Sequence, residues 1–124
     1  VARVDRGMTI KLAELSAEKK LPRLPVQLSG AKNPMRLAKV DKAGLLHFVT
    51  DGEEDLRPTA YGDLPLRDRA VLALALSAGE PENRFLYGIA GFYLECSGTV
   101  EAAAFYFGKA GPLVADQFGE FFGE

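Results

Sequence analysis

Residues 84–111 read RFLYGIAGFYLECSGTVEAAAFYFGKAG, and this stretch decides the second half of the fold. It contains no proline, and its apolar residues recur at intervals of three and four, which is typical of amphipathic helices. Gly98 interrupts the pattern and marks a turn between two helices. One face of the first helix is formed by four residues at helical spacing: Tyr87, Ala90, Gly91 and Leu94.

The second helix of this pair is expected to begin after Thr99, a suitable N-cap, and to end near residues 111–112. Gly91 and Ala103 are small where the two helices must approach each other closely. Phe107 is expected to fill the space between them. The stretch therefore predicts an antiparallel helical hairpin with a close-packed interface.

This hairpin resembles a tetratricopeptide repeat over about residues 84–112. The repeat pattern is a large aromatic, then Leu-Gly, Tyr, Ala, a second aromatic and Pro. Here Ala90-Gly91 takes the Leu-Gly position, with Tyr87 before it and Leu94 after it, and Phe107 is the second aromatic. The closing Pro is replaced by Ala115, with Pro112 close by. Small residues match at two further positions: Ala103 and Ala110.

The resemblance implies a protein-binding role, because such repeats stack into surfaces that hold other proteins. A stable array needs about three repeats, so one hairpin must pack on something else. Neighbouring helices are expected from Pro65 to Gly79 and from Leu113 to Phe122. The other candidates are the N-terminal half of the chain and a partner protein.

The first half of the chain is predicted to be β. Met8, Ile10 and Leu12 alternate with polar residues, as does the stretch 24–28, and a last short strand is expected at 56–61. Residues 35–40 and 45–50 should pair as a hairpin closed by Gly44, which can take positive φ.

The predicted fold class is thus α+β. A small antiparallel sheet or partial barrel (residues 1–62) is followed by a segment of three or four tetratricopeptide-like helices (residues 63–124), and the two pack as one compact unit. In its number of strands and the spacing of its turns, the first half faintly resembles SH3-like and Sm-like barrels.

Composition limits the class of protein. Hydrophobic residues make up 48% and charged residues 26%, which suits a globular chain, and no apolar run is long enough to span a bilayer. The single cysteine excludes an intrachain disulfide. Because the chain begins with Val1, we expect a processed protein or a piece of a longer one. Both a cytoplasmic and an exported location remain open.

Charge is divided unevenly along the chain. Residues 1–60 carry 11 Lys/Arg and 8 Asp/Glu, a net of +3, whereas residues 61–124 carry 4 and 9, a net of −5. The excess of positive charge in the first half is too small for a typical nucleic-acid-binding domain. We therefore interpret its basic residues as scattered solubilising charge and not as phosphate contacts. The basic residues in question are Lys11, Lys19, Lys20, Arg23, Lys32, Arg36, Lys39 and Lys42.

No catalytic, cofactor or metal site is predicted. His47, the only histidine, is expected to be a solvated strand residue, and Cys96 a small core residue near a helix end. The acidic run at residues 51–55 lacks the spacing of a calcium loop and is interpreted as a solvated turn.

The favoured hypothesis is a non-enzymatic protein-binding or scaffolding module that binds a protein partner or a second copy. Alternatives are nucleic-acid binding through the basic N-terminal sheet, or an accessory domain of an enzyme. Phe118, Phe121 and Phe122 form an apolar stripe that either caps the hairpin or docks on a partner. The predicted protein-binding residues are Phe118, Phe121, Phe122, Tyr87 and Tyr106.

Overall fold

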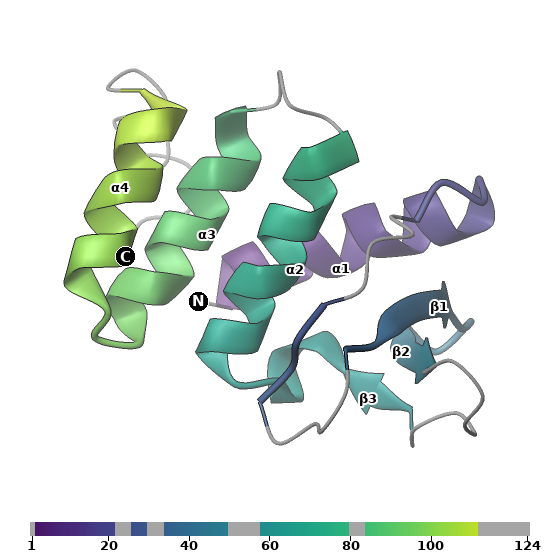
Figure 1. Cartoon of the computed structure of the whole chain (residues 1–124). Helices are drawn as coiled ribbons and strands as arrows, with labels where there is room; N and C mark the ends of the chain where they lie inside the picture. The colour runs from purple at the N-terminus through teal and green to yellow at the C-terminus, as the bar shows by residue number, and fades with distance from the viewer. Residues whose placement is uncertain (1, 22–25, 30–33, 50–57, 80–83, 112–124) are drawn as a thin grey trace.

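The computed structural model describes residues 2–21, 26–29, 34–49, 58–79 and 84–111, and it confirms the α+β class. A first helix precedes a three-stranded antiparallel sheet, a short 3-10 turn and three further helices (Figure 1). The elements in chain order are α1 (Ala2–Ala17), β1 (Arg36–Val40), β2 (Leu45–Val49), β3 (Thr59–Ala60), η1 (Tyr61–Asp63), α2 (Leu66–Gly79), α3 (Arg84–Cys96) and α4 (Val100–Ala110).

The predicted hairpin around Gly44 is confirmed. Strands β1 and β2 pair antiparallel, and Gly44 closes the turn with φ of +84°. A β-bulge lies between Leu37 and Lys39, and β3 adds to the other edge of β2. Of the strand expected at 56–61, residues 56–57 lie outside the described part, and within residues 58–61 only Thr59–Ala60 form a strand.

The strand predicted at Met8–Leu12 is wrong, because this stretch belongs to helix α1. Met8 and Leu12 are buried together with Val4, at the i, i+4, i+8 spacing of one helix face. Ile10, which a strand would have placed on the same side as Met8, is 53% exposed. The segment predicted to be β-rich therefore begins with a helix of 16 residues.

Of the strand predicted at 24–28, the structure describes residues 26–28, and these form no continuous strand. In the described part of that stretch, Val26 makes an isolated antiparallel bridge with Met35, just before β1. Ser29 then donates its backbone N–H and its hydroxyl to the buried carboxylate of Asp68, at 2.8 to 3.1 Å. This contact fastens the segment to the first turn of α2.

The three helices of the second half agree with prediction. Helix α2 begins after Pro65 and ends at Gly79, and α4 begins after Thr99 and ends before Gly111. Thr99 stands at the N-cap, but its hydroxyl makes no capping hydrogen bond and contacts the Ser97 hydroxyl at 3.2 Å. The helix predicted at Leu113–Phe122 lies outside the described residues.

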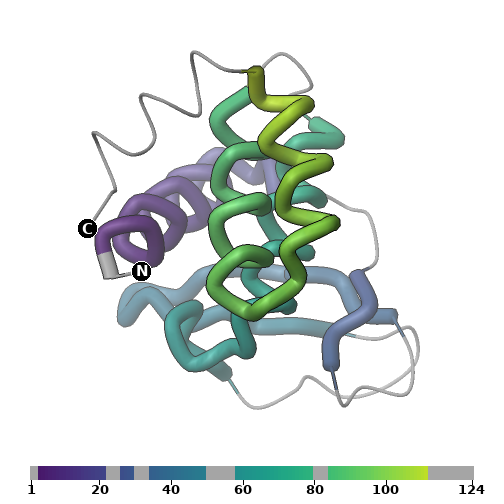
Figure 2. The backbone as a smooth tube through the Cα atoms, turned by 90° about the vertical axis from the view of Figure 1, so that its left-hand side faces the viewer, coloured from purple at the N-terminus to yellow at the C-terminus, as the bar shows by residue number. Residues whose placement is uncertain are grey.

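The elements enclose one hydrophobic core. Helices α2, α3 and α4 lie side by side as a layer, α1 crosses one side of this layer, and the sheet lies beneath them (Figures 1 and 2). The core cluster takes side chains from α1, from the inner face of the sheet and from α2, α3 and α4. Leu46 and Phe48 of β2 are almost fully buried in it, so the described parts of the two halves share one interior.

Candidate protein-binding surface

The α3–α4 hairpin is packed as closely as its sequence predicted. A Cβ atom built on Gly91 would lie 3.1 Å from Cδ1 of Phe107 and 3.2 Å from the carbonyl oxygen of Ala103. Ordinary van der Waals contact begins at 3.4 Å, so only glycine fits between these helices without displacement. Gly98 closes the turn with φ of +89°. This packing fixes the side chains that the two helices present on their outer surface.

Four residues form an aromatic cluster on that surface: Tyr87, Phe105, Tyr106 and Lys109. The rings of Tyr87 and Tyr106 are nearly parallel, with centroids 6.4 Å apart and planes 7° apart. Phe105 meets Tyr106 edge to face at 5.1 Å. The Lys109 ammonium lies 5.2 Å from the Tyr87 ring centroid and 5.4 Å from that of Phe105. The predicted binding residues Tyr87 and Tyr106 are thus brought together.

Phe105 and Lys109 were not predicted as binding residues. Phe105 is 59% exposed although it is a large apolar side chain. The signal in the sequence was the run Phe105-Tyr106-Phe107, since three successive aromatics on a helix cannot all face one core. Phe107 takes the interior position, and Phe105 projects outward.

A groove adjoins this cluster between α2 and α4, with α3 as its floor. We call it the α2–α4 groove, and it encloses about 310 Å³. Most of its lining is apolar, and Tyr106 belongs both to it and to the aromatic cluster. It is lined by Arg67, Ala70, Val71, Leu74, Leu94, Thr99, Ala102 and Tyr106.

A polar network holds α1 against α2 and α3 and so fixes the frame of this surface. The Asp5 carboxylate accepts hydrogen bonds from the Tyr93 hydroxyl at 2.6 Å and from the Arg69 guanidinium at 3.0 Å. Arg69 also donates to the carbonyl oxygens of Leu64 and Gly62. The side chains of Asp5 and Arg69 are only 18% and 11% exposed, so this ion pair is largely screened from water.

The two tyrosines of the network are held in the neutral form. Burial raises the pKa of the Tyr93 phenol and the pKa of the Tyr61 phenol well above their ordinary value of 10.0. Their rings meet edge to face at 6.1 Å, and the Tyr61 hydroxyl donates to the Arg69 carbonyl oxygen at 3.2 Å. The network therefore supplies neutral hydrogen-bond donors that join η1, α2 and α3.

His47 and Cys96 differ from prediction. His47 is not a freely solvated residue, because its Nε2 lies 2.9 Å from the Asp41 carboxylate and its side chain is 15% exposed. The hydrogen bond from His47 lowers the pKa of Asp41, and those from the Leu45 and Ala43 backbone add to this. This pair fastens the β1–β2 turn. Cys96 is exposed at the end of α3 and is not a core residue.

Several predicted sites lie outside the described residues or have no counterpart within them. Phe118, Phe121, Phe122 and the acidic run at 51–55 lie outside the described part. Within the described part, no group of three or more His, Cys, Asp or Glu residues is placed to hold a metal ion. No helix there is long and apolar enough to cross a membrane.

Comparison with known proteins gives no assignment for this chain. A scan against protein-family models, a search of curated proteins and a search of solved structures each found no match.

Proposed function

We propose that this chain is a non-enzymatic protein-binding or scaffolding module that holds a helix of a protein partner in the α2–α4 groove. The observation that carries the proposal is the apolar groove that runs into an exposed aromatic cluster at Tyr106. The α3–α4 hairpin, which resembles a tetratricopeptide repeat, positions both features.

The lining of the groove has the periodicity that a docked helix needs. Thr99 at the N-cap of α4 and Ala102 and Tyr106 within it fall at i, i+3 and i+7, so they form one stripe along the groove. On the opposite wall, Ala70 and Leu74 are spaced by four on α2. Small side chains on both walls let another helix approach closely, as ridges-into-grooves packing requires. An amphipathic helix is thus the partner element that this shape favours.

The aromatic cluster supplies the residues on which binding energy is usually concentrated. Aromatic side chains are enriched at the centres of protein interfaces because they bury a large area at little conformational cost. Phe105 is already held edge to face on Tyr106, and Lys109 lies over the neighbouring rings, so both are partly ordered before binding. We expect Phe105 to become buried when the partner binds.

The test is site-specific photo-crosslinking with the full chain. A photoreactive benzoylphenylalanine replaces Phe105 in one sample and Ile10 of α1 in a control sample. The two positions are matched, since the native side chains are 59% and 53% exposed. With an extract of the source organism, we expect one dominant adduct at position 105, located by mass spectrometry on a helical segment of the partner.

A second pair of variants links the adduct to the groove. Leu74→Lys places a charge on the groove wall, whereas Ala78→Lys places it on an exposed site of the same helix outside the groove. Circular dichroism first establishes that both variants fold. The Leu74 variant should lose most of the adduct and the Ala78 variant should keep it. Equal adducts at positions 105 and 10, or no effect of Leu74→Lys in a folded variant, would refute the proposal.

Self-association is a separate outcome of the same experiment. If the purified chain alone gives the adduct and light scattering shows a dimer, the partner helix belongs to a second copy. The aromatic stripe of the C-terminal segment can then be tested with the variant Phe118→Ser, Phe121→Ser, Phe122→Ser. Undiminished association of a folded triple variant would exclude that stripe as the docking element.

A further inference from the structure

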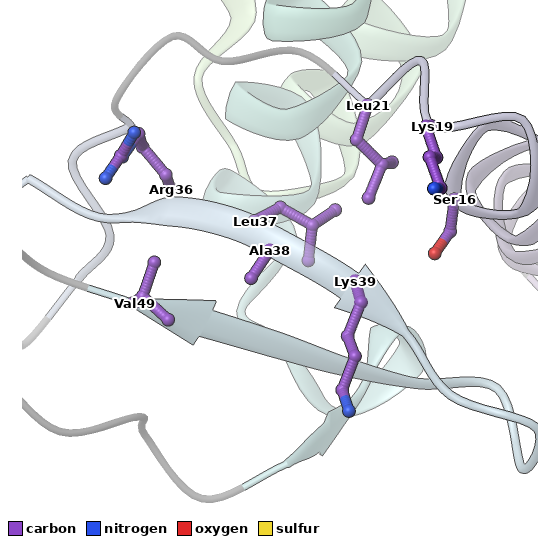
Figure 3. A pocket seen from close by; sticks show the side chains of 8 residues that line it. All are labelled: Ser16, Lys19, Leu21, Arg36, Leu37, Ala38, Lys39 and Val49. Carbon is purple, nitrogen blue, oxygen red and sulfur yellow. The ribbon is translucent and has the colours of Figure 1, made fainter.

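A second groove lies on the opposite side of the fold from α4, along the edge of strand β1. We call it the β1 groove, and it encloses about 530 Å³ between the end of α1 and the sheet (Figure 3). It shares no residue with the α2–α4 groove. Its lining residues are Ser16, Lys19, Leu21, Arg36, Leu37, Ala38, Lys39 and Val49.

Among the described residues that line this groove, every charged side chain is a cation. Lys19, Arg36 and Lys39 line it, and no lining residue is acidic. Of the described carboxylates nearest to the two lysines in sequence, Glu18 forms an ion pair with Lys20 at 3.8 Å, and Asp41 lies 2.9 Å from Nε2 of His47. Cations that line a groove attract an anionic partner and speed its encounter with the protein.

The interior of the groove is apolar and the cations stand apart around it. In Figure 3 the side chain of Leu21 points from the segment after α1 toward β1, where Leu37 lies, while Val49 lies on β2. Lys19 and Arg36 are at opposite ends of this apolar patch, and Lys39 lies on the strand between them. Cations that converged on one point would suit a single phosphate group. Separated cations suit an extended ligand with several negative charges and apolar groups between them.

The edge of β1 that faces away from β2 cannot pair with an added strand along its whole length. Met35, just before β1, exchanges both backbone hydrogen bonds with Val26, and the Val40 N–H is bonded to the Ser16 hydroxyl at 2.9 Å. The bulge at Leu37–Lys39 disturbs the stretch that remains. Because bulges and blocked ends protect an edge strand from pairing, recognition at this groove must depend on side chains.

Lys19 has an unusual backbone conformation at this site. It takes φ of +58° where α1 ends, a position at which glycine is strongly preferred. The surrounding hydrogen bonds, from Lys19 N to Ser16 O and from Lys20 N to Leu15 O, are those of a standard helix end. A lysine here carries a conformational cost that glycine would avoid, while it places a cation at the mouth of the groove.

We propose that the β1 groove binds an acidic peptide segment of another protein, with apolar side chains that enter the groove and carboxylates that contact Lys19 and Lys39. A nucleic acid suits the lining less well. None of the described lining residues is aromatic, so they offer bases no stacking platform, and their three cations are few for phosphate-driven binding. This site is separate from the α2–α4 groove, and the proposal stands or falls independently of the one above.

The test uses the full chain and three labelled octapeptides. The first alternates Asp with Leu, the second has Asn in place of Asp, and the third has Ser in place of Leu. Binding is followed by fluorescence anisotropy and mapped by amide chemical shifts in NMR spectra. We expect the Asp-Leu peptide to bind most tightly, with shifts at Lys19, Leu37 and Val49, and with affinity that falls as salt is raised.

The variants Lys19→Gly and Lys39→Ala each remove one of the two lysines that line the groove, and Lys42→Ala is the matched control. Lys42 is exposed in the β1–β2 turn and does not line the groove. Lys19→Gly also relieves the positive φ, so we expect this variant to stay folded, and circular dichroism checks this before binding is measured. We expect each groove variant to weaken binding roughly threefold to tenfold, as is typical of charge pairs at the rim of an interface, and the control to change nothing.

Three results would overturn the proposal. The first is no amide shift in the groove with the Asp-Leu peptide at about 1 mM, a concentration that detects weak complexes. The second is equal binding of the Asp-Leu and Asp-Ser peptides, which would indicate a simple anion site. The third is tighter binding of a labelled oligothymidine at the same amides, which would assign the groove to nucleic acid.

Discussion

The contact between α3 and α4 at Gly91 gives the sharpest prediction of stability. Gly91→Ala adds one methyl group within 3.2 Å of both the Phe107 ring and the Ala103 carbonyl oxygen. The carbonyl belongs to the backbone of α4 and cannot rotate away, so the two helices must separate by a few tenths of an ångström. Overpacking of this kind costs about 1 to 3 kcal/mol.

The matched control is Gly108→Ala in α4. A Cβ atom at Gly108 would meet nothing within 4 Å. Both substitutions gain about 1 kcal/mol of helix propensity, because alanine replaces glycine inside a helix. This gain cancels when the two variants are compared, so the difference between them measures the cost of the contact alone. We expect Gly108→Ala to stabilise the chain and Gly91→Ala to be about 1 to 3 kcal/mol less stable than Gly108→Ala.

The assay is urea denaturation of the full chain followed by circular dichroism, with the midpoint and slope fitted for each variant. A double variant, Gly91→Ala with Phe107→Leu, tests whether the ring is the partner. The coupling free energy should then exceed about 0.5 kcal/mol, as it does for residues in contact. If Gly91→Ala stabilises the chain as much as Gly108→Ala does, the close approach of α3 and α4 is refuted.

Three further predictions concern the rest of the fold. Asp5→Asn leaves the largely buried Arg69 guanidinium without its counter-ion, so we expect the free energy of unfolding, measured by urea denaturation, to fall by about 2 kcal/mol. The control Asp63→Asn changes an exposed carboxylate and should lower the free energy of unfolding only slightly. Equal effects of the two variants would refute the role of the network. The folded-state pKa of Asp41 is below its ordinary value of 3.8, so its stabilising effect is present above that pH and is lost as pH falls through the folded value. Thermal melts between about pH 2 and pH 5 should therefore show a steeper loss of stability for the native chain than for Asp41→Asn, and parallel curves would contradict this. Lys19→Gly should raise the free energy of unfolding by about 1 kcal/mol because it removes a positive φ from a non-glycine residue, and a loss of stability would show that the Lys19 side chain stabilises the fold.

Local signals were sufficient for the helices of the second half. Pro65 and Gly79 bracket α2, and Gly98 and Gly111 bracket α4, so chain-breaking residues placed the bounds. Gly91 and Phe107 could be paired from the sequence, because a hairpin with a three-residue turn fixes which positions face each other. The β1–β2 hairpin was predictable for the same reason, since Gly44 defined its turn.

The candidate binding surfaces could be predicted only in part from the sequence. Tyr87 and Tyr106 were predicted to bind, and their packing follows from the hairpin. The α2–α4 groove depends on how α2 sits against α3, and the β1 groove depends on where α1 ends relative to the sheet. No local sequence pattern predicts how these elements are placed relative to one another. Lys19, Arg36 and Lys39 were read as scattered charge, and the fold brings them around one groove.

The helical second half and its close hairpin could be predicted from the residues alone, because their signals act between residues close together in the chain. The same kind of signal did not determine α1. Met8, Ile10 and Leu12 fit a period of two, while Val4, Met8 and Leu12 fit a helix face, and both patterns coexist in one stretch. Only the tertiary structure decided between them, since the core covers Val4, Met8 and Leu12 and leaves Ile10 exposed. Asp5, Arg69 and Tyr93 then meet across the layers, and this contact cannot be predicted before the helices are packed.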